Sequence, residues 1–219
     1  IVDQHGTDLK AVKDAITDPE YVNVYFSNNK LTPQQMNLLY NIADITVLMS
    51  SNEGWGLSLT ESMMAGTMIA ANVTGGMQDQ MRFVKDGKWL DYDADFPSNH
   101  RGTVKDCGDW AIPVFPTNIS LVGSVPTPYI FDDRCNPEDA AEALVKVFNM
   151  SPEQRDENGM KGHEWIIGDE ARMSARKMSQ NIVEVLDEGF KNFKPRTTFD
   201  SHKIGERPVK YAPHKLTGY

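Results

Sequence analysis

The sequence has no long apolar run and very little cysteine. No window approaches about 18 uninterrupted apolar residues, so we expect no segment to span a bilayer. The only cysteines are Cys107 and Cys135, and neither has a partner cysteine or histidine at a metal-binding spacing. A disulfide framework and a metal site are therefore not expected, and a reducing cytoplasmic location fits best.

A secretory leader is not expected either, because the chain opens on Ile1 and shows no basic stretch followed by an apolar one. This opening predicts that the chain begins inside a longer protein. A basic excess is absent too: the formal net charge is −9. An acidic protein is a poor ligand for nucleic acid, since phosphate binding needs a basic face.

The charge is distributed unevenly along the chain. From Lys191 onward there are seven Lys or Arg residues and only two acidic ones. With Pro195, Pro208 and Pro213, residues 194–219 are interpreted as a basic extended tail. Such a tail could touch an anionic membrane or an acidic partner, but a solvated extension is the favoured interpretation.

Short apolar runs alternate with helical patterns, which is typical of a parallel sheet covered by helices. Strands are expected at 22–26, 45–50, 68–73 and 111–115, with 1–2 as the stub of another. Helices are expected at 32–43, 57–66, 76–85, 136–149, 151–165 and 170–193. The pattern predicts a Rossmann-like, doubly wound α/β domain over residues 1–193.

Two of these helices have a clear start signal. Thr32 precedes Pro33 and is followed three residues later by Gln35, and Ser151, Pro152 and Gln154 repeat this spacing. The last helix carries an apolar stripe at three-and-four spacing, which we interpret as core packing. Its members are Met173, Met178, Ile182, Val185, Leu186 and Phe190.

Residues 87–135 interrupt the alternation with five prolines. We interpret them as a long insertion with some order of its own, because a structureless loop of this length is unusual inside a domain. Trp110, Phe115, Tyr129 and Phe131 are too many aromatics for a freely solvated segment. The insertion is expected to fold back on the domain, or to pack against another subunit or a missing half. Its role stays open between packed decoration and shaping of an acceptor site.

The segment 45–66 carries the most informative chemistry. A buried strand leads into a turn with Gly54 and Gly56, and a helix follows at once. Glycine lets a ligand approach the backbone closely, and the helix start offers unpaired N–H groups to a phosphate. Glu53 and Glu61 stand on either side of that start, and carboxylates accept hydrogen bonds from sugar hydroxyls. One crevice at the carboxyl end of the strands could therefore hold a sugar, a diphosphate and a ribose.

These residues resemble the E-x7-E motif of retaining GT-B glycosyltransferases of family 4. The family typically shows Glu-Gly-Phe-Gly-Leu, Glu-Ala-Met and Gly-Thr-Pro-Val, then Gly-Gly. This chain has the matching segments 53–57, 61–63 and 66–69, then Gly75-Gly76, and the similar lead-in 39–44. The resemblance extends over about residues 22–84, with a weaker echo at 137–147 and in the C-terminal helices.

The resemblance implies that the chain is the C-terminal, donor-binding half of a GT-B fold. It assigns the donor sugar to Glu53 as the catalytic residue, and the ribose to Glu61. The nucleotide-sugar-binding set would be Glu53, Gly54, Trp55, Gly56, Leu57, Ser58 and Glu61. The base would lie near Asn29, Lys30 and Leu31. The implied reaction transfers a sugar with retention to a glycan, lipid or small-molecule acceptor, with no metal and no cofactor.

The chain departs from the family pattern at Met49, Met68, Ser58 and Trp55. The family's Arg and Lys that clamp the diphosphate, and its N-terminal half, would precede Ile1. We therefore expect the 219 residues alone to transfer no sugar. Gly75-Gly76 could serve a ligand or simply a turn. Two other functions stay open: a non-catalytic nucleotide- or glycan-binding module, and a nucleotide-sugar epimerase on the same fold.

Overall fold

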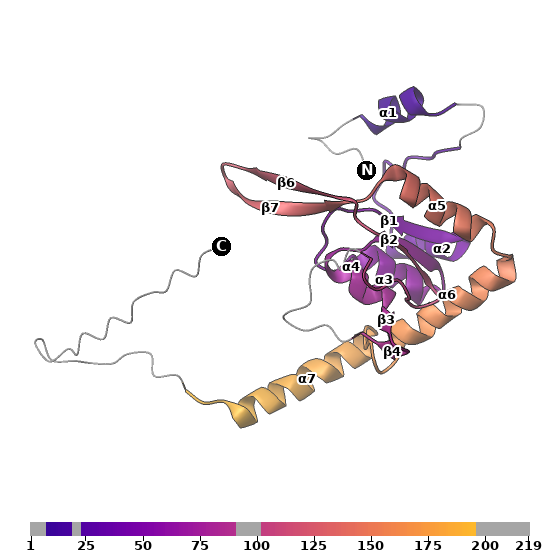
Figure 1. Ribbon diagram of the computed structural model, residues 1–219. Coiled ribbons are helices and arrows are strands. Elements are labelled where there is room, and N and C mark those ends of the chain that lie inside the picture. Colours follow the sequence, from indigo (N-terminus) through magenta and orange to yellow (C-terminus); the bar gives the residue numbers. More distant parts are fainter. Residues whose placement is uncertain (1–7, 19–22, 91–101, 196–219) are drawn as a thin grey trace, which may run out of the picture. The chain divides into compact units, whose positions relative to one another are not determined.

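A three-stranded parallel sheet forms the centre of the fold. The computed structural model describes residues 8–18, 23–90 and 102–195 (Figure 1). The sheet has the order β1-β2-β5, with β1 at Ile45–Leu48, β2 at Met68–Asn72 and β5 at Ala111–Val114. Ile45 is paired with Met68, and Ile69 with Ala111. The predicted mixed α/β fold with a Rossmann-like parallel sheet is confirmed.

Both faces of the sheet are covered, because alternate residues of β2 point to opposite sides. Ile69 and Ala71 join a buried cluster with Leu59, Met77 and Ile166, which come from α3, α4 and α6. Met68 and Ala70 join a second cluster with Ala143 and Val147 of α5. Every residue of β2 is buried, which explains why this strand reads as a continuous apolar run.

The helices begin and end close to the predicted positions. α2 covers Pro33–Ile42, α3 Leu57–Met64, α4 Gly75–Met81, α5 Pro137–Phe148 and α6 Pro152–Ile167. Thr32 with Gln35, and Ser151 with Gln154, form complete capping boxes. α4 is shorter than predicted, since Arg82 adopts a left-handed conformation (φ 50°) and ends it. α1, at Leu9–Ile16, was not predicted.

The predicted strand at 22–26 is wrong for the described residues 23–26, which have no sheet partner. An apolar run becomes a strand only when a neighbour supplies its ladder hydrogen bonds. Within the described ranges, β1 pairs with β2 alone, so no strand lies on its other side to receive this segment. The predicted strand stub at residues 1–2 lies outside the described residues.

Residues 87–135 are not a single insertion, since they contain β5, which pairs with the central strand. They also contain β4, at Lys88–Trp89, which forms a short hairpin with β3, at Val84–Lys85. A second hairpin joins β6, at Asn118–Ser124, to β7, at Thr127–Arg134. Residues 91–101 lie outside the described part of the chain.

The aromatics of this segment have two different environments. Trp110 is 5 % exposed and stacks on Trp165 of α6, with 5.2 Å between the ring centroids. Tyr129 and Phe131 of β7 are 66 % and 70 % exposed, so their predicted packing against the domain is wrong, whereas packing against another subunit or a missing half stays a prediction. The base of the β6–β7 hairpin is held by two hydrogen bonds: Asp133 N–H donates to Ser51 O (3.0 Å), and Thr74 Oγ1 donates to Asp133 Oδ2 (2.7 Å).

The chain divides by its internal contacts into two units, residues 1–178 and 179–219. α7, at Ala175–Asn192, begins five residues later than predicted and spans this division. Met173 packs on the larger cluster, but the predicted core role of the remaining apolar stripe is wrong, since no residue of α7 is buried.

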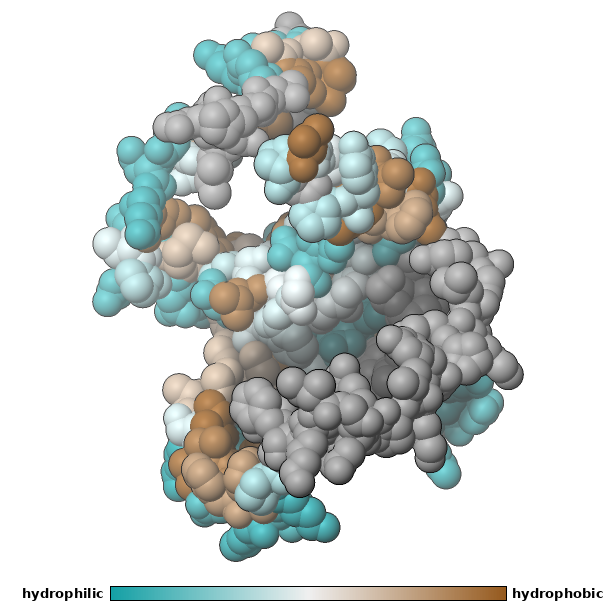
Figure 2. Space-filling model, turned by 90° about the vertical axis from the view of Figure 1, so that its left-hand side faces the viewer, coloured by the Kyte–Doolittle hydropathy of each residue, from teal (hydrophilic) through white to brown (hydrophobic). Residues whose placement is uncertain are grey.

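Exposed hydrophobic residues appear in brown in Figure 2. None of the described helices is long and apolar enough to span a bilayer. The tail at 196–219 lies outside the described residues.

Candidate functional site

The candidate site is the turn between β1 and α3, formed by Glu53, Gly54, Trp55 and Gly56 and called the 53–56 turn below. It follows the carboxyl end of a parallel strand, where open α/β sheets bind their ligands. Gly56 is the N-cap of α3 and has a left-handed backbone (φ 85°). A Cβ there would lie 3.2 Å from side-chain atoms of Leu48 and Met77, so both conformation and space favour glycine.

The start of α3 presents N–H groups to which no described residue supplies an acceptor. Gly56 offers no capping side chain, and its carbonyl accepts from Leu59 N–H at 3.0 Å. The N–H groups of Leu57 and Ser58 have no acceptor among the described residues. Leu57 is exposed and Ser58 is half-buried. A helix start of this kind suits an anion, because its free N–H groups and the helix dipole both favour negative charge.

The start of α4 supports the 53–56 turn from behind. Gly76 N–H donates to Glu53 O at 3.1 Å. A Cβ on Gly75 would lie 2.3 Å from Glu53 O, and one on Gly76 would lie 2.2 Å from Gly54 O. Gly75-Gly76 thus supports the turn by close backbone packing, which accounts for both glycines without a ligand.

The two acidic residues of the motif have different surroundings. Glu53 is half-buried, and its carboxylate has no hydrogen-bond partner in the described ranges. Glu61 is exposed, and its Oε2 accepts from the Tyr40 hydroxyl at 2.9 Å. The other oxygen, Oε1, accepts no hydrogen bond from the described residues, so Glu61 keeps one acceptor oxygen for a ligand.

Tyr40 on α2 is a site residue that the sequence did not identify. Its ring is 8 % exposed, and Thr67 Oγ1 donates to its backbone carbonyl at 2.6 Å. Burial, and then the hydrogen bond to the Glu61 carboxylate, raise the pKa of Tyr40 to about 12. The lead-in segment 39–44 contains this residue, but the contact with Glu61 joins two helices and has no local signature.

The raised pKa of Tyr40 predicts a loss of stability in alkali. The unfolded chain would release this proton near pH 10 and the folded chain near pH 12, so the contribution of Tyr40 is full below pH 10 and is lost as pH rises toward 12. Urea unfolding at a series of pH values should show a steeper decline for wild type than for Tyr40→Phe. Parallel declines for the two proteins would contradict the raised pKa.

Of the predicted base contacts, Asn29 and Lys30 are exposed and Leu31 is half-buried. They belong to an irregular segment in which Ser27 Oγ donates to Asn29 O at 3.3 Å. Because none of the described residues ahead of them forms a strand, the reason for placing them at the carboxyl end of the sheet is absent. Their role in base binding stays a prediction.

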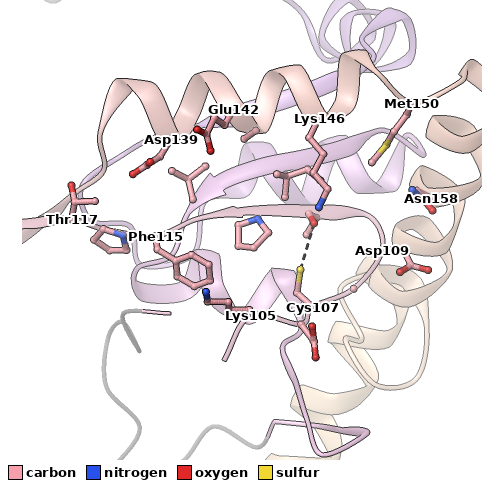
Figure 3. A pocket seen from close by; sticks show the side chains of 18 residues that line it. Lys105, Cys107, Asp109, Phe115, Thr117, Asp139, Glu142, Lys146, Met150 and Asn158 are labelled. Atoms are coloured by element: carbon pink, nitrogen blue, oxygen red, sulfur yellow. Dashed lines mark hydrogen bonds between the residues drawn. The ribbon is translucent and has the colours of Figure 1, made fainter. Parts of the chain in front are cut away.

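A cavity of about 970 Å³ lies elsewhere, along the outer edge of β5 and beneath α5 (Figure 3). Cys107, Lys146 and Asp109 are among its lining residues, and the 53–56 turn is not. The Cys107 thiol donates to Ala111 O at 3.5 Å, and burial raises its pKa to about 12, so the thiol stays protonated. Both cysteines are free.

A smaller cavity of about 370 Å³ opens beside the end of β1. It is lined by Met49, Ser51 and Arg134, among others, and the return of β7 to the sheet brings Arg134 there. No local pattern in the sequence predicts this position of Arg134, since it depends on long-range contacts of Asp133 with Ser51 and Thr74.

The comparison with known families bears on this turn directly. Residues 2–93 match the sequence model of the glycosyl transferases group 1. The matched segment contains the 53–56 turn, all of α3 and the Gly75-Gly76 support. No curated protein matches the chain. The match to glycosyl transferases group 1 supports glycosyl transfer as the general activity.

Proposed function

We propose that the 53–56 turn and the start of α3 bind a nucleotide-diphosphate sugar whose sugar is transferred with retention. One observation carries the proposal. The segment similar to glycosyl transferases group 1 folds into a glycine turn at the carboxyl end of a parallel strand, followed by a helix whose first N–H groups have no acceptor among the described residues. This arrangement has the chemistry that a diphosphate requires.

In this proposal the diphosphate lies against the N–H groups of Leu57 and Ser58. Fixed donors of this kind stabilise the charge that develops on a leaving diphosphate without reorganising during the reaction. Glu53 is the proposed catalytic residue, because its half-buried carboxylate has no partner among the described residues and can accept hydrogen bonds from the donor sugar.

Glu61 is proposed to bind the ribose. Its Oε2 is held by Tyr40, which fixes the direction of the carboxylate, and Oε1 is left to accept from a ribose hydroxyl. Gly54 has nothing within 4 Å of an added Cβ, so open space lies on that side of the turn for the donor. Neither metal nor cofactor is part of the proposed mechanism, and the acceptor is a glycan, a lipid or a small molecule.

Glu61→Ala is the most direct test of this proposal. The change should weaken nucleoside-diphosphate binding by about 1.5–3 kcal/mol, the range for hydrogen bonds to a charged group. The measurement is titration calorimetry of the 219-residue chain with UDP, GDP and ADP. Glu164→Ala, at an exposed position of α6, is a matched control that should leave the affinity unchanged.

Two outcomes would count against the proposed function. The wild-type chain could bind none of the three nucleotides, or Glu61→Ala could bind them as tightly as wild type does. Tyr40→Phe separates the role of the carboxylate from that of its support, since it leaves Glu61 in place. We expect a smaller loss of affinity in Tyr40→Phe than in Glu61→Ala.

A further inference from the structure

Three side chains form a closed hydrogen-bond network beneath the 53–56 turn. Trp55 Nε1 donates to Thr60 Oγ1 at 2.8 Å, and Thr60 Oγ1 donates to Gln80 Oε1 at 2.8 Å. The Gln80 amide nitrogen donates to two carbonyls of the turn, those of Trp55 and Gly56, the latter at 3.2 Å. Thr60 is 4 % exposed and Gln80 is fully buried.

The network uses the hydrogen-bonding groups of all three side chains. The Thr60 hydroxyl accepts one bond and donates one, and the Gln80 amide accepts one and donates two. A side chain that bonds in this way has little freedom to turn. Gln80 lies on α4 and Thr60 on α3, so the network joins both helices to the turn between β1 and α3.

The two carbonyls held by Gln80 determine where the next N–H groups point. In a trans peptide unit the C=O and the following N–H point in opposite directions. The described residues contain no cis peptide bond. Since the carbonyls of Trp55 and Gly56 point inward to Gln80, the N–H groups of Gly56 and Leu57 point outward, away from Gln80.

We infer that Gln80 and Thr60 are positioning residues that fix the backbone of Gly56 and so aim the Leu57 N–H group at the diphosphate of the ligand. The inference rests on the proposed function of the 53–56 turn and adds two residues that would not touch the ligand. An apolar pair could fill the same buried space, but it could not hold two carbonyls. The indole of Trp55 is fixed by the same network, which keeps this ring in one place at the site.

Gln80→Met and Thr60→Val test the inference, because each keeps much of the side-chain volume and removes the hydrogen bonds. Each should weaken binding of UDP, GDP or ADP by about five- to tenfold, since misaligned N–H groups form poorer bonds to phosphate oxygens. Thr60→Ser keeps the hydroxyl and should bind as tightly as wild type. Affinities are measured by titration calorimetry and stability by thermal unfolding.

Ser62→Ala is the matched control for loss of stability alone. Ser62 is buried on the same helix as Thr60, and its Oγ donates to Thr46 Oγ1 at 2.8 Å. The change removes a buried hydrogen bond from α3 without touching the turn. It should lower the melting temperature and leave nucleotide affinity unchanged.

The outcomes separate this inference from the function on which it rests. If wild type binds no nucleotide, the proposed function fails and the inference fails with it. If wild type binds but Gln80→Met and Thr60→Val bind equally well, only the positioning role is overturned. Weakened binding in Ser62→Ala, or in Thr60→Ser to the same degree as in Thr60→Val, would also overturn it. If Gln80→Met does not fold, the comparison of Thr60→Val with Thr60→Ser decides.

Discussion

Replacing Gly159 by alanine should lower the free energy of unfolding by about 3 kcal/mol or more. Gly159 lies in α6 against the chain that links α3 to β2, and a Cβ there would be 1.9 Å from Gly66 O and 2.8 Å from Gly66 C. Both neighbours are backbone atoms, so α6 itself must move away from the sheet. Such a shift would separate Trp110 and Ile166, which share the larger core cluster.

Urea unfolding monitored by circular dichroism measures this loss. Gly189→Ala in α7 is the matched control, because Gly189 is also helical and has nothing within 4 Å of an added Cβ. That change should stabilise its own helix by about 0.5–1 kcal/mol, the propensity difference between the two residues. Equal unfolding midpoints for Gly159→Ala and wild type would show that α6 does not pack on Gly66 as closely as described.

Replacing Gly76 by alanine should displace the 53–56 turn and abolish measurable nucleotide binding. The added Cβ would lie 2.2 Å from Gly54 O and 2.8 Å from Trp55 Cα, and both atoms belong to the backbone of the turn. Relief of this clash must move the turn or α4. We expect a loss of about 2 kcal/mol in stability and the loss of the aligned N–H groups.

Gly54→Ala separates the effect on binding from the effect on folding. An added Cβ on Gly54 meets no atom within 4 Å, so the stability of this variant should stay near that of wild type. Its nucleotide affinity should still fall, because the methyl group enters the space proposed for the ligand. Calorimetry and thermal unfolding of both variants check these results. Wild-type affinity in Gly76→Ala would mean that the support by α4 does not matter for binding.

The parts of the fold that were predicted correctly have local causes. Thr32 with Gln35 and Ser151 with Gln154 satisfy the first N–H groups of their helices within one turn of chain, so the sequence alone shows where these helices begin. β1 and β2 were found from short β-branched runs between turn residues. The 53–56 turn was found in the same way, from its glycines and the helix behind it.

The errors have causes that lie far apart in the sequence. Residues 23–26 have a strand-like composition, but a ladder partner decides whether a strand forms. The strand β5 was predicted within the proline-rich segment, but its pairing with the central strand β2 was not predicted. The contacts of Glu61 with Tyr40 and of Thr60 with Gln80 join different helices, and no residue spacing in the sequence predicts them. A local signal for the β3–β4 hairpin was available in Asp86-Gly87, since both residues have the positive φ that tight hairpin turns require.

The outer edge of β5 is poorly suited to pairing with a strand of another chain. Trp110 O accepts from Ile69 N–H of β2 and Val114 O from Val73 N–H just after it, so the backbone groups of Ala111 and Pro113 face outward. Ala111 N–H donates to Gly108 O at 3.0 Å, and Ala111 O accepts from the Cys107 thiol. Pro113 has no N–H. An incoming strand would therefore find no outward N–H of β5 available as a donor. This edge of the sheet is therefore a poor template for edge-to-edge aggregation, and its protection comes from Pro113 within β5 and from Cys107 and Gly108 just before it.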